Sequence, residues 1–400
     1  MRLAFITHEP FYPPSGGGSA EAIYLVQELA KRGHEVRIFC PKVLDPEKVR
    51  QQFGVHLHEF QTWQMGRYTS FRNFKYLLYP FFLQRMVESH ARRIKFDLIL
   101  SQHAISAVAA GRLKQTLQVP VVMNFLDYLT GFMETWPAYL APPPVLRALK
   151  KFELSLPLKH QADAVLTVSD TLADYFADTG YERKRILPIY YGYDAALFPF
   201  SEANVRNSQP GPPKIAMHGS LDHHHLRTIA LEAIEHVVRS QPNVIFKFVG
   251  HRTDALQNFL QQVARRVPSA KIETTGFVPY NEVARHLANA SIGIVPYEES
   301  TGTHCAFVAK IVEYLALGLP VVSTPLNSAL RYFKSEPMVR FSKFTGASFG
   351  EGILSWLREP PEGRYDLARA ASERVRNALD WSRISKNAID FVEKTFQASH

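Results

Sequence analysis

The chain is poor in cysteine, in acidic residues and in long apolar runs. Its 400 residues include two cysteines, Cys40 and Cys305, which argues against a disulfide framework and suits a reducing compartment. No apolar run reaches about 18 residues, so the sequence predicts no transmembrane helix. Residues 1–7 carry one positive charge and precede His8 and Glu9, a pattern typical of a first strand rather than a signal peptide. We therefore expect a cytoplasmic protein.

The shortage of acidic residues is concentrated in one quarter of the chain. The net charge is +9, and residues 51–150 hold 11 Lys and Arg against 5 Asp and Glu. Aromatic and basic residues alternate within residues 60–95: Trp63, Arg67, Tyr68, Phe71, Arg72, Phe74, Lys75, Tyr76, Tyr79, Phe81, Phe82 and Arg85. This pattern favours contact with an anionic membrane surface at residues 60–95. A helix with buried aromatics and solvated cations is the alternative, and nucleic acid is not an expected partner.

Strands and helices alternate along the whole chain. Expected strands are 3–7, 36–40, 96–101, 119–124 and 164–168, then 214–218, 244–249, 272–275, 292–296 and 321–323. A glycine-rich loop and a helix over 20–32 follow the first strand, which makes a doubly wound unit. We expect an α/β fold of two Rossmann-like domains facing a cleft. The expected parts are residues 1–198, a linker at 199–213, residues 214–378, and a helix at 379–400 that crosses back to the first domain.

The segment 309–324 carries the clearest functional signal. Lys310 and Glu313 are three residues apart, so they share one face of an otherwise apolar helix that ends at Gly318. A carboxylate can accept two sugar hydroxyls, and an ammonium can neutralise a phosphate. The pair therefore suits a nucleotide-sugar, with a solvent-exposed ion pair as the alternative.

Several motifs occur together in one order. They are Pro13-Pro14-Ser15-Gly16-Gly17-Gly18, Gly33-His34-Glu35-Val36, Val168-Ser169 with Gly180, Pro188 to Phe198, His218-Gly219-Ser220, Val249-Gly250, Thr275-Gly276 to Pro296, and Glu313 to Val322. With them the chain resembles a GT-B glycosyltransferase of the family 4 group over nearly its whole length. Each motif alone is weak, whereas their order and spacing are specific.

The resemblance implies the donor site. Glu313 would bind the ribose hydroxyls and Lys310 the diphosphate, with a helix after the 219–220 loop adding its positive end. The implied donor-binding set is Gly17, Gly18, Gly219, Ser220, Arg227, Gly250, Lys310 and Glu313. Glycines 16–18 alone could equally form a flexible turn. The donor would be a nucleotide-sugar, with UDP favoured, and no cofactor or metal is expected.

Three positions depart from the family pattern. Cys305 replaces the first of two acidic residues, with Glu298 and Glu299 lying upstream. Arg227 is the one fixed cation after the donor loop, where His223-His224-His225 stand; neighbouring loop histidines should diverge, so we favour a phosphate-proximal loop over a metal site.

The third departure concerns the acceptor side. Leu126 stands where many relatives have His, while Asp127 remains. We expect Asp127 to accept or position the acceptor hydroxyl proton, with His103 as the alternative acid–base residue. Asp127 could instead cap the following helix.

The resemblance implies a transferase that moves a sugar to a glycan or polyprenyl-linked acceptor in surface polysaccharide or glycolipid synthesis. Retention at the anomeric carbon is favoured over inversion. The alternatives are a GT-B sugar-nucleotide epimerase and a non-catalytic nucleotide-sugar-binding protein. The enzyme would lie at the inner face of the plasma membrane.

Overall fold

The computed structural model describes residues 1–12, 17–61, 72–202, 205 and 211–399. Contacts between residues divide the chain into two compact units. The first unit comprises Met1–Thr130, Pro143–Tyr190 and Trp381–His400, and the second comprises Gly131–Pro142 and Tyr191–Asp380. The sequence had placed this boundary at residue 198 and had not separated residues 131–142 from the first domain. Much of the expected linker and residues 62–71 of the basic segment lie outside the described residues.

The first unit is built on a seven-stranded parallel sheet in the order β3-β2-β1-β4-β5-β6-β7. Its strands are β1 (Arg2–Thr7), β2 (Glu35–Pro41), β3 (His56–Phe60), β4 (Leu98–Gln102), β5 (Val121–Phe125), β6 (Ala164–Thr167) and β7 (Ile186–Pro188). In register, Leu3 of β1 lies opposite Val36 on one side and Leu98 on the other. These apolar side chains are buried because helices cover both faces of a parallel sheet.

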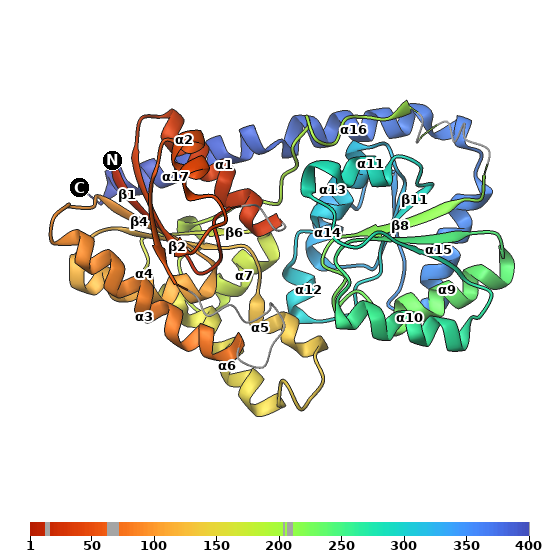
Figure 1. Cartoon of the computed structure of the whole chain (residues 1–400), viewed down its shortest axis with the longest axis horizontal. Coiled ribbons are helices and arrows are strands. Elements are labelled where there is room, and N and C mark those ends of the chain that lie inside the picture. The colour runs from red at the N-terminus through yellow and green to blue at the C-terminus, as the bar shows by residue number, and fades with distance from the viewer. Residues whose placement is uncertain (13–16, 62–71, 203–204, 206–210, 400) are drawn as a thin grey trace. The chain divides into compact units, whose positions relative to one another are not determined.

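The helices of the first unit form two layers. They are α1 (Gly17–Lys31), α2 (Pro46–Phe53), α3 (Arg72–Ala91), α4 (His103–Leu117), α5 (Leu129–Phe132), α6 (Pro143–Lys159), α7 (Asp170–Asp178) and α17 (Trp381–Ala398). Helices α3 and α6 both pack on α4, whereas α1 packs on α2 and α17 (Figure 1). Right-handed crossovers in opposite directions from β1 and β4 explain this division.

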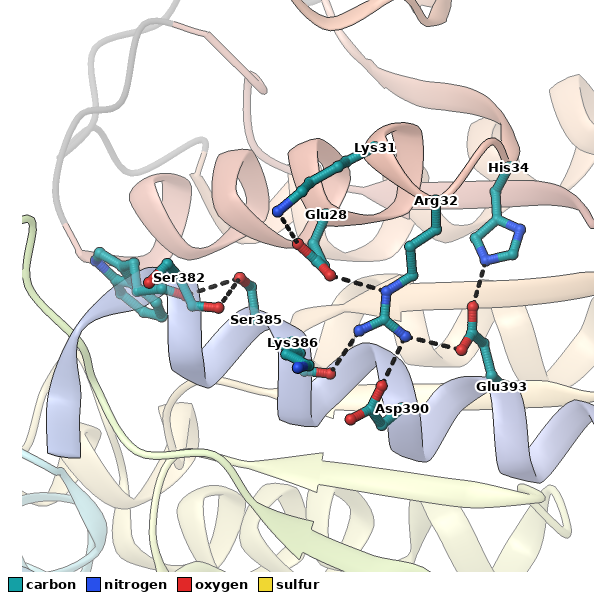
Figure 2. Close-up of polar contacts among 10 residues, drawn as sticks. Glu28, Lys31, Arg32, His34, Ser382, Ser385, Lys386, Asp390 and Glu393 are labelled. Carbon is teal, nitrogen blue, oxygen red and sulfur yellow. Dashed lines mark hydrogen bonds and ion pairs between the residues drawn. The ribbon is translucent and has the colours of Figure 1, made fainter. Parts of the chain in front are cut away.

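Ion pairs and hydrogen bonds hold the C-terminal helix α17 against α1. Arg32, directly after α1, donates to Glu28 of α1 and, across the interface, to Asp390 at 2.7 Å and Glu393 at 2.8 Å (Figure 2). His34 contacts the other oxygen of Glu393 at 2.7 Å. The Arg32 side chain is only 17% exposed, so removing its partners would leave a poorly solvated cation. This network stabilises α17 against the first unit.

The second unit is built on a six-stranded parallel sheet in the order β10-β9-β8-β11-β12-β13. Its strands are β8 (Lys214–His218), β9 (Ile245–Val249), β10 (Lys271–Thr274), β11 (Ile292–Val295), β12 (Val321–Ser323) and β13 (Val339–Phe341). Its helices are α9 (Thr228–Ser240), α10 (Asp254–Arg266), α11 (Val283–Leu287), α12 (Thr301–Cys305), α13 (Ala309–Ala316), α14 (Asn327–Phe333), α15 (Gly346–Arg358) and α16 (Tyr365–Leu379). The expected α/β class with two Rossmann-like sheets is confirmed. No helix in the described part of the chain is long and apolar enough to cross a membrane.

Candidate functional site

Each sheet has one point where the strand order reverses. In the first unit it lies between β1 and β4, and in the second between β8 and β11. Loops that leave the carboxyl ends of two such strands run in opposite directions, which opens a crevice where ligands bind in open α/β sheets. The expected site residues Lys310, Glu313 and Gly219 follow β8 or β11, and His103 follows β4.

Glu313 lies on α13 with its side chain only 5% exposed. Its Oε2 contacts His218 Nε2 at 2.5 Å, and its Oε1 accepts a hydrogen bond from the Tyr280 hydroxyl at 2.8 Å. Each carboxylate oxygen has a second lone pair, so the group can still accept from a ligand hydroxyl. The two partners fix its orientation before any ligand arrives.

His218, the last residue of β8, is itself held by Tyr314. The Tyr314 hydroxyl accepts a hydrogen bond from the backbone N–H of His218 at 3.2 Å and contacts His218 Nδ1 at 3.1 Å. Tyr314 is fully buried, and burial raises the pKa of its hydroxyl well above the ordinary value, so it stays neutral. A chain of contacts therefore runs from the core of the sheet to the carboxylate of Glu313.

Lys310 lies in the first turn of the same helix. Its Nζ donates to the Tyr297 hydroxyl at 3.1 Å and lies 5.4 Å from the centre of that ring. Among the described residues it forms no ion pair with a carboxylate. The N-cap residue of α13, Val308, offers no side-chain hydrogen bond. A cation at the positive end of a helix is unfavourable by itself, and the two together attract an anion.

His225 lies in the loop between β8 and α9 (residues 219–227, the donor loop) and approaches Lys310, and its tautomer is fixed. Its Nδ1 accepts a hydrogen bond from the backbone N–H of Asp222 at 3.2 Å, so its proton is on Nε2. Burial, with the charges of His224 and Lys310, holds the pKa of His225 well below its ordinary value, which keeps the ring neutral. Burial, followed by the charges of Lys310 and His223, lowers the pKa of His224 to about 3.

Two hydrogen-bond donors, on Lys310 and His225, lie next to each other. Lys310 Nζ and His225 Nε2 are 3.4 Å apart, and each carries only hydrogens toward the other. Neither can accept from its neighbour, so the contact gains nothing unless a third group accepts from both. A phosphate oxygen beside an uncapped helix end has the required charge and geometry.

Two of the expected glycines are required by close packing. Gly219 has φ of +112°, and a Cβ there would lie 2.9 Å from Cε of Lys310. A Cβ on Gly250 would lie 2.2 Å from the carbonyl oxygen of Gly219. The two glycines therefore let the donor loop lie against α13. Ser220 continues this loop and is half-buried.

The first turn of α9, the helix that follows the donor loop, contacts a side chain of the same unit. Glu298 accepts a hydrogen bond from the N–H of Ile229 in the first turn of α9 at 3.0 Å. A carboxylate thus engages one N–H at the positive end of α9, and the role of this helix in phosphate binding stays a prediction. Arg227 is exposed and donates to the carbonyl of Thr135 at 2.8 Å.

The remaining departures can also be located. Cys305 is fully buried at the end of α12, and Glu299 contacts His304 at 3.4 Å. The rings of His224 and His225 lie 3.8 Å apart, so the expectation that they diverge is wrong. In the described part of the chain no group of three or more His, Cys, Asp and Glu side chains could hold a metal ion.

In the first unit, His103 opens α4 with φ of +67°, a conformation that costs a non-glycine residue about 1 kcal/mol or more. Its ring lies edge-on to His8 at 5.1 Å, and its Nε2 is 3.7 Å from Glu9. Burial lowers the pKa of His103, although the charge of Glu9 acts in the opposite direction. The structure therefore favours a neutral imidazole there.

Asp127 follows β5 and lies near a buried carboxyl that the sequence analysis missed. Glu21 of α1 is fully buried, and its Oε1 accepts a hydrogen bond from Nδ2 of Asn124 at 2.6 Å. Burial raises the pKa of Glu21 to about 8; the Asn124 bond lowers it and the charge of Asp127 raises it. Glu21 is therefore largely protonated at neutral pH.

The helix after Asp127 begins at Leu129. The N–H groups of Leu129 and Thr130 donate to Glu153 of α6 at 3.0 and 2.8 Å. Glu153 thus supplies the carboxylate at the start of α5, the role that the sequence analysis had offered Asp127 as an alternative. Gly17 and Gly18 form the first turn of α1, and Gly16 lies outside the described residues.

Comparison with known families agrees with this geometry. The model described as Glycosyltransferase Family 4 matches residues 15–197, and the model described as Glycosyl transferases group 1 matches residues 212–340. The chain belongs to these glycosyltransferases. It is an enzyme of the GT-B class. No curated relative matches the chain in sequence.

Solved structures show the same fold at low sequence identity. Sucrose-phosphate synthase from Thermosynechococcus elongatus has a TM-score of 0.79 at 17% identity and covers 100% of both chains. HepE from Anabaena, in complex with UDP and glucose, has a TM-score of 0.74 at 16% identity and covers 98% of this chain and 99% of its own. WaaG, a glycosyltransferase involved in lipopolysaccharide biosynthesis, has a TM-score of 0.65 at 16% identity, with 97% and 98% covered. The glycosyltransferase therefore shares its fold with these enzymes.

Proposed function

We propose that this glycosyltransferase takes a sugar from a nucleotide-diphosphate sugar, UDP being the favoured nucleotide, and passes it to a glycan or polyprenyl-linked acceptor. One observation carries the donor assignment: Lys310 Nζ and His225 Nε2 face each other as donors at 3.4 Å, beside an uncapped helix start. A diphosphate is the acceptor that resolves this contact.

The donor's parts divide among the residues of the second unit. The diphosphate accepts from Lys310 and His225 and approaches the backbone of Gly219 and Ser220. The ribose hydroxyls donate to Glu313, each such bond being worth about 1.5–3 kcal/mol net. Gly250 serves by allowing the loop to close on α13. HepE, whose structure contains UDP, and a second HepE structure with UDP-glucose support the choice of UDP.

The acceptor is assigned to the first unit. Asp127 accepts or positions the proton of the attacking hydroxyl, and neutral His103 hydrogen-bonds the same substrate. Gly17 and Gly18 offer backbone N–H groups at the start of α1. Retention is the favoured outcome, as the family resemblance implies. We place the enzyme in the cytoplasm at a membrane surface, in polysaccharide or glycolipid synthesis, an assignment that WaaG's role in lipopolysaccharide biosynthesis supports.

A nucleotide panel tests the donor assignment. Thermal shifts are measured with UDP, GDP, ADP and the matching nucleotide-sugars on the wild type, Glu313→Gln and, as a matched control, Glu273→Gln. Glu273 is a partly exposed carboxylate on β10, paired with Lys214 in the same unit. At a ligand concentration about 100 times the dissociation constant, the correct donor adds about 2.7 kcal/mol of stability. We expect this gain in the control and its loss in Glu313→Gln.

An activity assay with the same nucleotide-sugars, run with and without acceptor, separates the competing functions. Turnover that needs both donor and acceptor indicates a transferase, turnover of donor alone to an isomeric nucleotide-sugar indicates an epimerase, and binding without turnover indicates a non-catalytic protein. Stabilisation by no nucleotide-sugar contradicts the proposed donor site. The anomeric configuration of the product, read by nuclear magnetic resonance, distinguishes retention from inversion.

A further inference from the structure

Helix α6 of the first unit carries a stripe of exposed apolar side chains. Val145, Leu149 and Phe152 are spaced four and three residues apart, so they share one side of the helix. Their residues are 54%, 37% and 42% exposed, and Leu158 in the last turn is 46% exposed. The buried residues of α6 include Leu146 and Glu153, beside the stripe, and Leu156, which continues it toward the last turn. Contiguous exposed apolar side chains mark an interaction surface.

The exposed charged residues of α6 are all basic. Helix α6 contains Arg147, Lys150, Lys151 and Lys159. Its one acidic residue, Glu153, is buried beneath the start of α5 and is used there. Arg147 and Lys151 are exposed and form no ion pair with any described residue. The exposed part of α6 therefore carries the apolar stripe and, farther round the helix, the cations, with no exposed carboxylate on the helix itself.

A second exposed stripe lies in the same layer of helices. Leu78, Phe81 and Phe82 of α3 are 37%, 44% and 39% exposed, whereas Tyr79 between them is buried. The guanidinium of Arg85 lies 5.2 Å from the centre of the Phe81 ring. Since α3 and α6 both pack on α4 and lie on the same side of the first sheet, the two stripes belong to one layer (Figure 1).

We propose that the outer face of α6, with the stripe of Val145, Leu149 and Phe152 and the cations Arg147 and Lys151, docks the enzyme on an anionic lipid surface. An amphipathic helix lying in the membrane interface has this composition: apolar side chains enter the acyl boundary, and Lys and Arg meet the anionic headgroups. The absence of exposed acid on α6 makes the face complementary to a negative surface. The sequence analysis had placed the membrane contact at residues 60–95, whereas the surface proposed here is formed by residues 145–152 of α6. The proposed function explains only why the enzyme would bind a membrane. Lipid binding itself is measured without donor or acceptor.

Vesicle co-sedimentation tests the surface. The full chain is mixed with vesicles of phosphatidylglycerol and phosphatidylcholine, or of phosphatidylcholine alone, at low and at high salt. We expect binding to the anionic vesicles that weakens with salt. The triple variant Val145→Ser/Leu149→Ser/Phe152→Ser should lower the partition coefficient about tenfold or more. The double variant Arg147→Gln/Lys151→Gln should lower it about twentyfold on anionic vesicles only.

Matched variants remove the same groups elsewhere. Leu44, Phe277 and Leu367 are exposed apolar residues scattered over the chain, and Arg265 and Lys334 are exposed cations without a described ion pair. Replacing the first three by Ser, or the last two by Gln, should leave vesicle binding within about twofold of the wild type. Since all the substituted residues are exposed, each variant should keep the wild-type melting temperature and thermal response to nucleotide.

The result can overturn the inference independently of the donor site. Absence of wild-type binding to anionic vesicles, equal binding to neutral vesicles, or equal losses in the matched controls and the α6 variants would each reject it. A protein that binds nucleotide-sugar but no vesicle would retain the proposed function and lose this surface. A protein that binds vesicles through α6 but no nucleotide would do the reverse.

Discussion

The two sheets place a buried carboxyl near the carboxyl ends of their strands, and they hold it in opposite ways. In the second unit both oxygens of Glu313 are engaged, one by His218 and the other by the Tyr280 hydroxyl. In the first unit Glu21 accepts one hydrogen bond from Asn124, and its Oε2 has no partner among the described residues. Similar topology has therefore produced two different carboxyl environments.

The difference lies in which groups approach the carboxyl. Glu313 shares a helix with Lys310, and its two partners can donate hydrogen bonds to it. Glu21 has an amide on one side and the negative charge of Asp127 nearby; burial raises its pKa to about 8. A carboxylate surrounded by donors is suited to fixed recognition of hydroxyls, whereas a buried neutral carboxyl can donate a proton or a hydrogen bond. Neighbouring side chains rather than sheet topology set the chemistry.

Removing the cation of the second unit should have the largest effect. In Lys310→Met the helix start loses its ammonium while the apolar stem remains, so the dissociation constant for UDP should rise about 10- to 100-fold, the equivalent of a charged hydrogen bond. Uridine binding should stay unchanged because it lacks the diphosphate. Isothermal titration of both ligands measures this, with Lys334→Met, an exposed lysine in the same unit, as control. A parallel loss for uridine would place Lys310 elsewhere than at the phosphates.

The sequence predicted the central strands better than the edges. Strands β1, β8 and β12 are short continuous apolar runs, and their predicted bounds agree with the structure to within one residue. The edge strands β3, β7 and β13 were not predicted, because HLHEF, ILP and VRF are too short or too poor in apolar residues to show a period. The edge strand β10 was predicted to within one residue. Edge strands are buried on fewer sides, so their composition is less constrained.

Some residues of the candidate site could likewise be predicted from the sequence, and others could not. Lys310 and Glu313 were found because helical spacing alone puts them on one face. His225 and Tyr280 could not be assigned, since their contacts with α13 depend on how loops from distant strands fold back. Glu21 did leave a signal: it stands four residues before the buried Leu25, where an amphipathic helix would place an apolar side chain.

The neutral carboxyl of the first unit should appear as a pH dependence of stability. The pKa of Glu21 is about 8 in the folded protein against an ordinary value of 4.5, so the folded state binds the proton more tightly. The contribution of Glu21 is therefore fully present below about pH 4.5 and is lost as the pH rises through about 8, by up to about 1.4 kcal/mol per pH unit within that window. Urea unfolding across this range should show the decline in the wild type.

Glu21→Gln supplies the matched control for that titration. The amide keeps the size of the side chain and an oxygen that can accept from Asn124, but it cannot ionise. The difference in unfolding free energy between Glu21→Gln and the wild type should therefore grow in favour of the variant as the pH rises toward 8. Parallel curves for the two proteins would mean that Glu21 does not carry a proton in the folded state.

The smallest effect is expected at His225, whose ring donates without charge. His225→Phe keeps the edge-to-face contact with Tyr297 and removes the Nε2 proton, so the dissociation constant for UDP should rise about fivefold, the equivalent of one neutral hydrogen bond. His225→Gln, which retains an N–H donor, should lose less. Because burial and the charge of Lys310 hold the pKa of His225 far below its ordinary value, the ratio of variant to wild-type affinity should stay constant between about pH 6 and pH 8. A ratio that rises toward low pH would mean that the His225 ring becomes protonated when the diphosphate binds. The second unit would then hold a proton on a buried side chain, as Glu21 does in the first unit.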